Sequence, residues 1–154
     1  MSRIVLIEID RLRAHELVER DRVEKLKEEL RRSGVLVRPI LVDEKNLIVI
    51  DGHHRVQALR ELGCKLVPAL LVDYENSNIC VVPWRDCDKV TKEDVVRAGL
   101  TGKLLPPKTS KHVILCDGCE RHVEFLEGEH PTPLEVLKGL NVRKGSPVVD
   151  LNLV

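Results

Sequence analysis

Residues 49–59 read Val-Ile-Asp-Gly-His-His-Arg-Val-Gln-Ala-Leu, and this stretch decides how the chain is interpreted. It begins with an apolar run of the kind found in strands buried on both faces. The pattern changes at Asp51, and Gly52 then allows a sharp turn and a close approach of the backbone to a ligand. Val56 and Leu59 follow at helical spacing. The stretch therefore predicts a strand, a tight turn and a helix.

This turn has the features of an anion-binding site. The first N–H groups of a helix have no partner within it and lie at the positive end of its dipole. His53, His54 and Arg55 add donors there, and an arginine can hold a phosphate through two parallel hydrogen bonds. Asp51 is placed to bind a metal ion attached to phosphates or to fix a histidine tautomer. The alternative is that Asp51 only caps the helix and the other side chains are solvated surface.

The rest of the chain alternates short β-rich runs with amphipathic helices. We expect strands at residues 4–7, 35–42, 47–50, 65–72, 79–82, 112–116 and 122–126. We expect helices at residues 21–33, 53–62, 91–99 and 132–138. Asp21 is expected to cap the first helix and Thr132 the last. The pattern predicts an α+β fold, a small mixed β-sheet with flanking helices.

Length, charge and composition exclude several classes of protein. A chain of 154 residues can bury a hydrophobic core without the help of disulfides or structural metal ions. Lys and Arg together equal Asp and Glu at 25 each, which disfavours a nucleic-acid partner held through phosphates. No apolar run approaches the ~20 residues that cross a bilayer, and the first residues do not resemble a signal peptide. We expect a cytoplasmic protein without a membrane partner, and its many Glu, Lys and Arg resemble a thermophile's composition.

The run from Val49 to Leu59 resembles the ParB/sulfiredoxin superfamily, whose members bind nucleotide phosphates at a Gly-x-x-Arg turn before a helix. It is more similar to the archaeal free serine kinases of that superfamily, which use ADP to make O-phosphoserine for cysteine synthesis. Residues 13–16, Arg-Ala-His-Glu, are similar to their Arg-Pro-His-Glu segment, and Trp84 follows the turn at a similar interval. Residues 106–112, Pro-Pro-Lys-Thr-Ser-Lys-His, are similar to their Pro-Pro-Lys-Thr-Thr-Arg-His segment.

This resemblance implies the fold of the superfamily and a role for each matched residue. Glu16 would be the catalytic base for the serine hydroxyl, with Glu19 as a rival, and Asp51 would take part in catalysis and hold Mg²⁺. The phosphates of ADP or ATP would be bound by Gly52, His53, His54 and Arg55. L-serine or the transferred phosphoryl group would be held by Trp84, Thr109, Ser110, Lys111 and His112. The chain is shorter than the archaeal kinases between Trp84 and Pro106, so the choice between ADP and ATP as phosphoryl donor stays open.

Three further questions stay open at the level of sequence. Cys116 and Cys119 form a Cys-x-x-Cys pair that could bind zinc, whereas Cys80 and Cys87 could form a disulfide, and free thiols are the third possibility. We expect a kinase domain at residues 1–112 and a C-terminal extension at 113–154, a hairpin and a short helix packed on the same domain. The runner-up function is a ParB-like nucleotide- or DNA-binding regulatory module without kinase activity. That module would need a second helix pair after the turn, and the segment after residue 90 predicts one clear helix.

Overall fold

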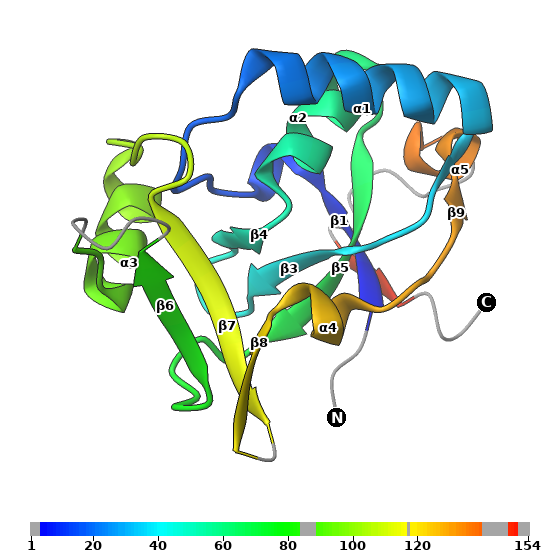
Figure 1. Ribbon diagram of the computed structural model, residues 1–154. Coiled ribbons are helices and arrows are strands. Elements are labelled where there is room, and N and C mark those ends of the chain that lie inside the picture. Colours follow the sequence, from blue (N-terminus) through cyan, green and yellow to red (C-terminus); the bar gives the residue numbers. More distant parts are fainter. Residues whose placement is uncertain (1–3, 84–88, 117, 140–147, 151–154) are drawn as a thin grey trace.

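The computed structural model describes residues 4–83, 89–116, 118–139 and 148–150 (Figure 1). Its centre is a five-stranded sheet with the order β10-β1-β5-β3-β4. The strands are β1 (Ile4–Glu8), β3 (Ile40–Asp43), β4 (Val49–Asp51), β5 (Leu66–Val72) and β10 (Val148–Asp150). β3 runs parallel to β5, while the other neighbouring pairs are antiparallel. The sheet is therefore mixed, and the predicted α+β class is confirmed.

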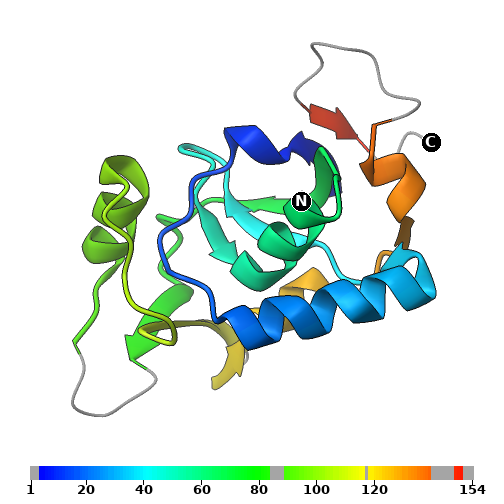
Figure 2. The same ribbon diagram turned by 90° about the horizontal axis from the view of Figure 1, so that it is seen from above.

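Two helices, α1 (Arg20–Ser33) and α2 (His53–Glu61), lie side by side over one face of this sheet (Figures 1 and 2). Successive side chains of a strand point to opposite sides, so the side chains of β3 contribute to a core on each face of the sheet. Ile40 and Val42 join the core beneath the helices, whereas Leu41 joins a second core on the other face. All three side chains are fully buried, as the continuous apolar run predicts.

The second core lies between the central sheet and a smaller antiparallel sheet. This sheet consists of β6 (Ile79–Pro83), β7 (Ser110–Cys116) and β8 (Cys119–His122). Helix α3 (Lys92–Thr101) lies between β6 and β7 in the chain, and Thr91 and Asp94 form its capping box. The remaining elements are short: η1 (Ile9–Arg11), β2 (Val35–Leu36), α4 (Glu124–Glu127), β9 (Thr132–Pro133) and α5 (Leu134–Leu137).

Several predicted helix ends were wrong. The N-cap of α1 is Glu19, which makes no side-chain cap, and Asp21 lies inside the first turn. Helix α3 continues past Gly99 to Thr101, and Gly102, whose φ is +79°, is its C-cap. Gly99 instead allows close packing, since a Cβ there would lie 2.8 Å from the Ile48 side chain. Thr132 belongs to β9 and does not cap α5.

The segment after residue 112 is built into the same sheets as the earlier residues. The expected boundary at 112 falls inside β7, while β9 pairs with β2 and β10 pairs with β1. The expected second hairpin strand at 122–126 was wrong, because the strand ends at His122 and α4 follows. Within the described ranges, no helix combines the length and the apolar character that crossing a bilayer requires.

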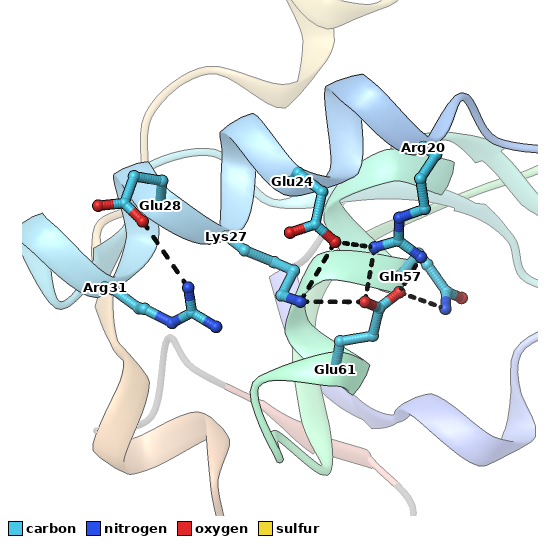
Figure 3. Close-up of polar contacts among 7 residues, drawn as sticks. All are labelled: Arg20, Glu24, Lys27, Glu28, Arg31, Gln57 and Glu61. Atoms are coloured by element: carbon cyan, nitrogen blue, oxygen red, sulfur yellow. Dashed lines mark hydrogen bonds and ion pairs between the residues drawn. The ribbon is translucent and has the colours of Figure 1, made fainter.

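An ion-pair network on the surface joins α1 to α2 (Figure 3). Glu61 of α2 accepts hydrogen bonds from Arg20 at 2.6 Å, from Lys27 at 3.1 Å and from Gln57 at 2.8 Å. Arg20 also contacts Glu24, one turn along α1, at 2.7 Å. The hydrogen bonds from Arg20 are the main reason why the pKa of Glu61 falls to about 2. Because the carboxylate is shared between two cations of α1, the network holds the two helices together more firmly than one isolated surface pair.

Candidate active site

One cavity of about 560 Å³ brings together most of the residues singled out in the sequence. It is bounded by the first turns of α1 and α2, by residues between Lys108 and His112, and by His122 and Glu124. Its lining includes these predicted residues: Glu16, Asp51, Gly52, His53, His54, Arg55, Ser110, Lys111 and His112. Thr109 contacts the site through its backbone, and Trp84 lies outside the described residues.

Gly52 forms the turn that opens the cavity. It is the N-cap of α2, and its φ of +113° is a conformation that side chains with a Cβ rarely adopt. A Cβ at this position would also lie 2.5 Å from Cγ2 of the buried Ile40. The first amide bonded within the helix is that of Val56, which donates to the Gly52 carbonyl. The preceding N–H groups of α2 therefore have no partner within the helix, as an anion-binding turn requires.

The two histidines of the turn are neutral donors rather than cations. The backbone N–H of His15 donates to Nε2 of His53 at 3.1 Å, and that of Glu19 donates to Nε2 of His54 at 3.0 Å. A ring nitrogen that accepts a hydrogen bond carries no proton, so the proton of each ring is on Nδ1. Burial lowers the pKa of both rings, and Arg22 lowers the pKa of His54 further. Each ring therefore offers an Nδ1–H donor without adding a full charge.

Arg55 is held by protein groups on two sides. It donates to the Pro39 carbonyl at 2.7 Å, to Asp51 at 3.2 Å and to Glu127 at 2.8 Å. The predicted phosphate role of Arg55 stays a prediction, because its guanidinium lines the cavity but already has these protein partners. Asp51 also lines the cavity. Since Mg²⁺ is commonly held by one or two carboxylates together with substrate phosphates, the donor set at this turn fits such an ion.

Glu127 is a site residue that sequence reasoning missed. Its side chain is fully buried, and its Oε1 has no hydrogen-bond partner among the described residues. Burial raises the pKa of Glu127 to about 8, although the neighbouring Arg55 acts in the opposite direction. The stretch 124–129 carries three glutamates with no feature that distinguishes this one. Only the fold, which brings α4 against the start of α2, reveals the contact.

Glu16 is placed by backbone hydrogen bonds on both sides of its segment. The chain pairs through Arg13 with Ile48 and through Glu16 with Leu105. Oε1 of Glu16 then accepts the N–H of Thr109 at 2.7 Å, while Oε2 lies 3.4 Å from the Ser110 hydroxyl. Burial raises the pKa of Glu16, and hydrogen bonds from residues 108–110 partly offset that effect. A carboxylate of raised pKa in a cavity is suited to act as a general base.

The rival base, Glu19, is less well placed. It is the N-cap residue of α1, and its Oε1 lies 3.6 Å from Nζ of Lys108. It is not part of the cavity lining. A general base must lie within hydrogen-bond reach of the proton that it takes, and a substrate in the cavity would be closer to Glu16. The geometry therefore favours Glu16 over Glu19.

A group of buried histidines lies behind Glu16. His15 is fully buried, and its ring nitrogens contact the Val49 carbonyl at 2.7 Å and the Ser110 hydroxyl at 2.9 Å. Nε2 of His112 lies 2.8 Å from the hydroxyl of Tyr74. Burial lowers the pKa of His112 well below its usual value, so this ring supplies no positive charge to the cavity. Lys108 and Lys111 are the charged side chains of that segment in the lining.

The described residues contain one group whose ligand atoms lie close enough to bind a metal ion, namely His15, Glu16 and His53. Both nitrogens of His15 and Nε2 of His53 already form hydrogen bonds, so the group fits a polar network better than a metal centre. The zinc prediction is not tested, because the Cys116 side chain lies outside the described part and Cys119 is exposed. Cys80 is a free thiol among the described residues, and its predicted partner Cys87 lies outside them.

Comparison with known proteins places this geometry in a family. The ParB N-terminal domain family matches residues 2–82. An ATP-dependent L-serine kinase of Staphylothermus marinus is 40% identical over 84 residues, which is 52% of this chain and 33% of that protein. An ADP-dependent L-serine kinase of Thermococcus kodakarensis is 31% identical over 96 residues, which is 60% of this chain and 40% of that protein. The matched stretches thus span well under half the length of these relatives.

A solved structure described as a free serine kinase in complex with AMP has the same fold. Its TM-score is 0.72 at 18% identity, and the superposition covers 88% of this chain and 93% of the other. This likeness agrees with the expected ParB/sulfiredoxin-like arrangement of a mixed sheet and flanking helices. The family match covers more than half of the chain and includes both Glu16 and the turn at Gly52. The protein therefore belongs to the ParB N-terminal domain family.

Proposed function

We propose that this protein is a kinase that transfers a phosphoryl group from ADP or ATP to the hydroxyl of free L-serine. The observation that carries the proposal is one cavity lined by both a carboxylate of raised pKa, Glu16, and the open N-terminus of α2. Base and anion-binding turn are the two parts that phosphoryl transfer needs. The names of the similar proteins from Staphylothermus marinus and Thermococcus kodakarensis support the same activity, although those proteins are longer.

The α2 turn would bind the phosphates of the donor. The N–H groups that precede Val56 offer hydrogen bonds, and His53 and His54 add neutral Nδ1–H donors. Arg55 adds positive charge and keeps Asp51 oriented through its hydrogen bond. When bound, Mg²⁺ would be held by Asp51 and the phosphates and would neutralise charge on the transferred group.

Glu16 would take the proton of the serine hydroxyl while the serine oxygen attacks the terminal phosphorus atom. The bond between that phosphorus and the bridging oxygen breaks, which releases AMP from ADP or ADP from ATP. Lys111, in the cavity lining, would neutralise the serine carboxylate or the transferred phosphoryl group. The product would be O-phosphoserine, which we propose serves cysteine biosynthesis in the cytoplasm.

The ParB-like regulatory module is less well supported. A DNA-binding module of that kind would need a helix pair after the nucleotide turn. After α3, the described residues contain two helices of four residues each, α4 and α5, and both lie next to strands of the existing sheets. Binding of nucleotide without turnover remains the outcome that the assay below separates from catalysis.

The decisive test is incubation of the protein with Mg²⁺, L-serine and either ADP or ATP, with ³¹P NMR used to detect O-phosphoserine. We expect product with at least one donor. The variant Glu16→Gln should lose turnover by about 10²-fold or more, because general-base catalysis contributes that much, and should still bind nucleotide. Glu19→Gln is the matched control and should stay within a few-fold of the wild type. Absence of product with both donors would refute the proposed function.

A further inference from the structure

We propose that His15 is a positioning residue that accepts the hydrogen bond of the Ser110 hydroxyl. This keeps the hydroxyl proton away from Oε2 of Glu16, which can then accept the proton of the substrate. This inference rests on the proposed kinase function where turnover is concerned. Its structural part concerns the direction of a single hydrogen bond and can be tested without turnover.

The tautomer of His15 follows from its contact with the backbone. The Val49 carbonyl lies 2.7 Å from Nδ1, and a carbonyl oxygen can only accept a hydrogen bond. Nδ1 therefore carries a proton. The ring is fully buried, and burial lowers its pKa to about 4, so the ring is neutral near pH 7. Nε2 then has a lone pair and no proton.

The environment of His15 favours this neutral form. The ring of His53 lies edge-on with its centroid 4.5 Å away, and the ring of His112 lies 5.6 Å away. Burial lowers the pKa of both neighbouring rings well below the usual value. Asp51, which acts on the pKa of His15 in the opposite direction, is a weaker influence than burial. A positive charge in this group would be costly, since it would be buried beside other rings.

The Ser110 hydroxyl must consequently donate to His15. Its oxygen lies 2.9 Å from Nε2 of His15, a normal hydrogen-bond length, and 3.4 Å from Oε2 of Glu16, which is long for an O–H···O bond. A serine hydroxyl has one proton and cannot serve both acceptors. With that proton on the side of His15, Ser110 presents its oxygen, not its proton, to Glu16.

The two oxygens of Glu16 thus differ. Oε1 accepts the short hydrogen bond from the Thr109 N–H at 2.7 Å, whereas Oε2 receives no proton from the Ser110 hydroxyl. A hydrogen bond to a carboxylate stabilises its charged form and lowers its pKa. By keeping the Ser110 proton away, His15 preserves the basicity of Glu16 and assigns Oε2 as the atom that takes the serine proton.

The test is an NMR titration of the Glu16 carboxyl carbon in four proteins: wild type, His15→Asn, Ser110→Ala and the double variant. In His15→Asn, the introduced side-chain amide could still donate to the Val49 carbonyl but offers no acceptor at the position of Nε2. We expect the Ser110 proton to turn to Glu16 in this variant and to lower the proton affinity of Glu16 about tenfold. Ser110→Ala should leave that affinity near the wild-type value, and adding Ser110→Ala to His15→Asn should restore it.

Two results would overturn the proposal. One is a clear rise in the pKa of Glu16 in Ser110→Ala, which would mean that Ser110 donates to Glu16 in the wild type. The other is a ¹⁵N spectrum of His15 that places its proton on Nε2. Both remain readable if His15→Asn fails to fold, and neither needs activity. In an active enzyme, His15→Asn should also move the acidic limb of the kcat/KM profile to lower pH, whereas a purely structural defect would lower the rate without moving it.

Discussion

Replacing Gly52 with alanine should be among the most destabilising single changes in the turn. The added Cβ would meet Cγ2 of Ile40 at 2.5 Å, and the φ of +113° is unfavourable for alanine. A left-handed backbone costs about 1–2 kcal/mol for a residue with a Cβ, and overpacking a core costs about 1–3 kcal/mol more. The sum, about 2–5 kcal/mol, is a large part of the roughly 5–15 kcal/mol that typically stabilises a domain of this kind. Urea denaturation at pH 7 measures the loss.

Gly102→Ala is the matched control, because Gly102 also has a positive φ, +79°, but nothing lies within 4 Å of its added Cβ. It should lose only the backbone part, about 1–2 kcal/mol. Ile40→Ala removes the nearer clashing atom, Cγ2, but keeps Cβ at 2.9 Å, so Gly52→Ala should cost less in that background than in the wild type, by part of the ~1–3 kcal/mol of overpacking. Equal costs of Gly52→Ala in the two backgrounds, or equal losses at Gly52 and Gly102, would refute the reasoning.

Two further predictions concern buried and surface charges. Because the pKa of Glu127 is raised from 4.5 to about 8, its contribution to stability is present below pH 4.5 and lost as the pH rises through 8. The free energy of unfolding of Glu127→Gln should therefore increase by about 1–3 kcal/mol relative to that of the wild type as the pH rises from 6 to 9, as measured by urea denaturation. A difference between the two proteins that stays constant across that pH range would contradict this. Glu61→Gln should lower the Tm, because it removes the shared partner of Arg20 and Lys27. Calorimetry in about 1 M salt should show a smaller loss than in dilute buffer, since salt screens exposed charges.

Features that depend on neighbouring residues could be predicted from the sequence. The helix at α1 follows from its apolar spacing, and its end follows from Gly34, which has the left-handed φ of +71° that is typical of a C-terminal glycine. The turn at Gly52 followed from the change of pattern after a buried strand, and its steric need for glycine agrees. Glu16 was found only through its resemblance to a family segment, because an isolated glutamate carries no signal of its own.

Features that depend on distant contacts could not be predicted. Arg55 and Glu127 are 72 residues apart, and His15 and Ser110 are 95 apart. The helical periodicity around Gly99 also gave no indication that its missing side chain makes room for Ile48. In each case the decisive partner comes from another element, and short-range patterns describe only which face of an element is buried.

The parallel bridge between Glu16 and Leu105 has a consequence for how the protein is made. The N-terminal segment cannot complete its hydrogen bonds until the chain has been synthesised beyond residue 105, and closing so long a loop is slow and entropically costly. A nascent or truncated polypeptide that stops at residue 82 would therefore contain the residues of the α2 turn but leave the proposed base without its support. The position of Glu16 in the cavity should then be completed only late in biosynthesis, after Leu105 has been added.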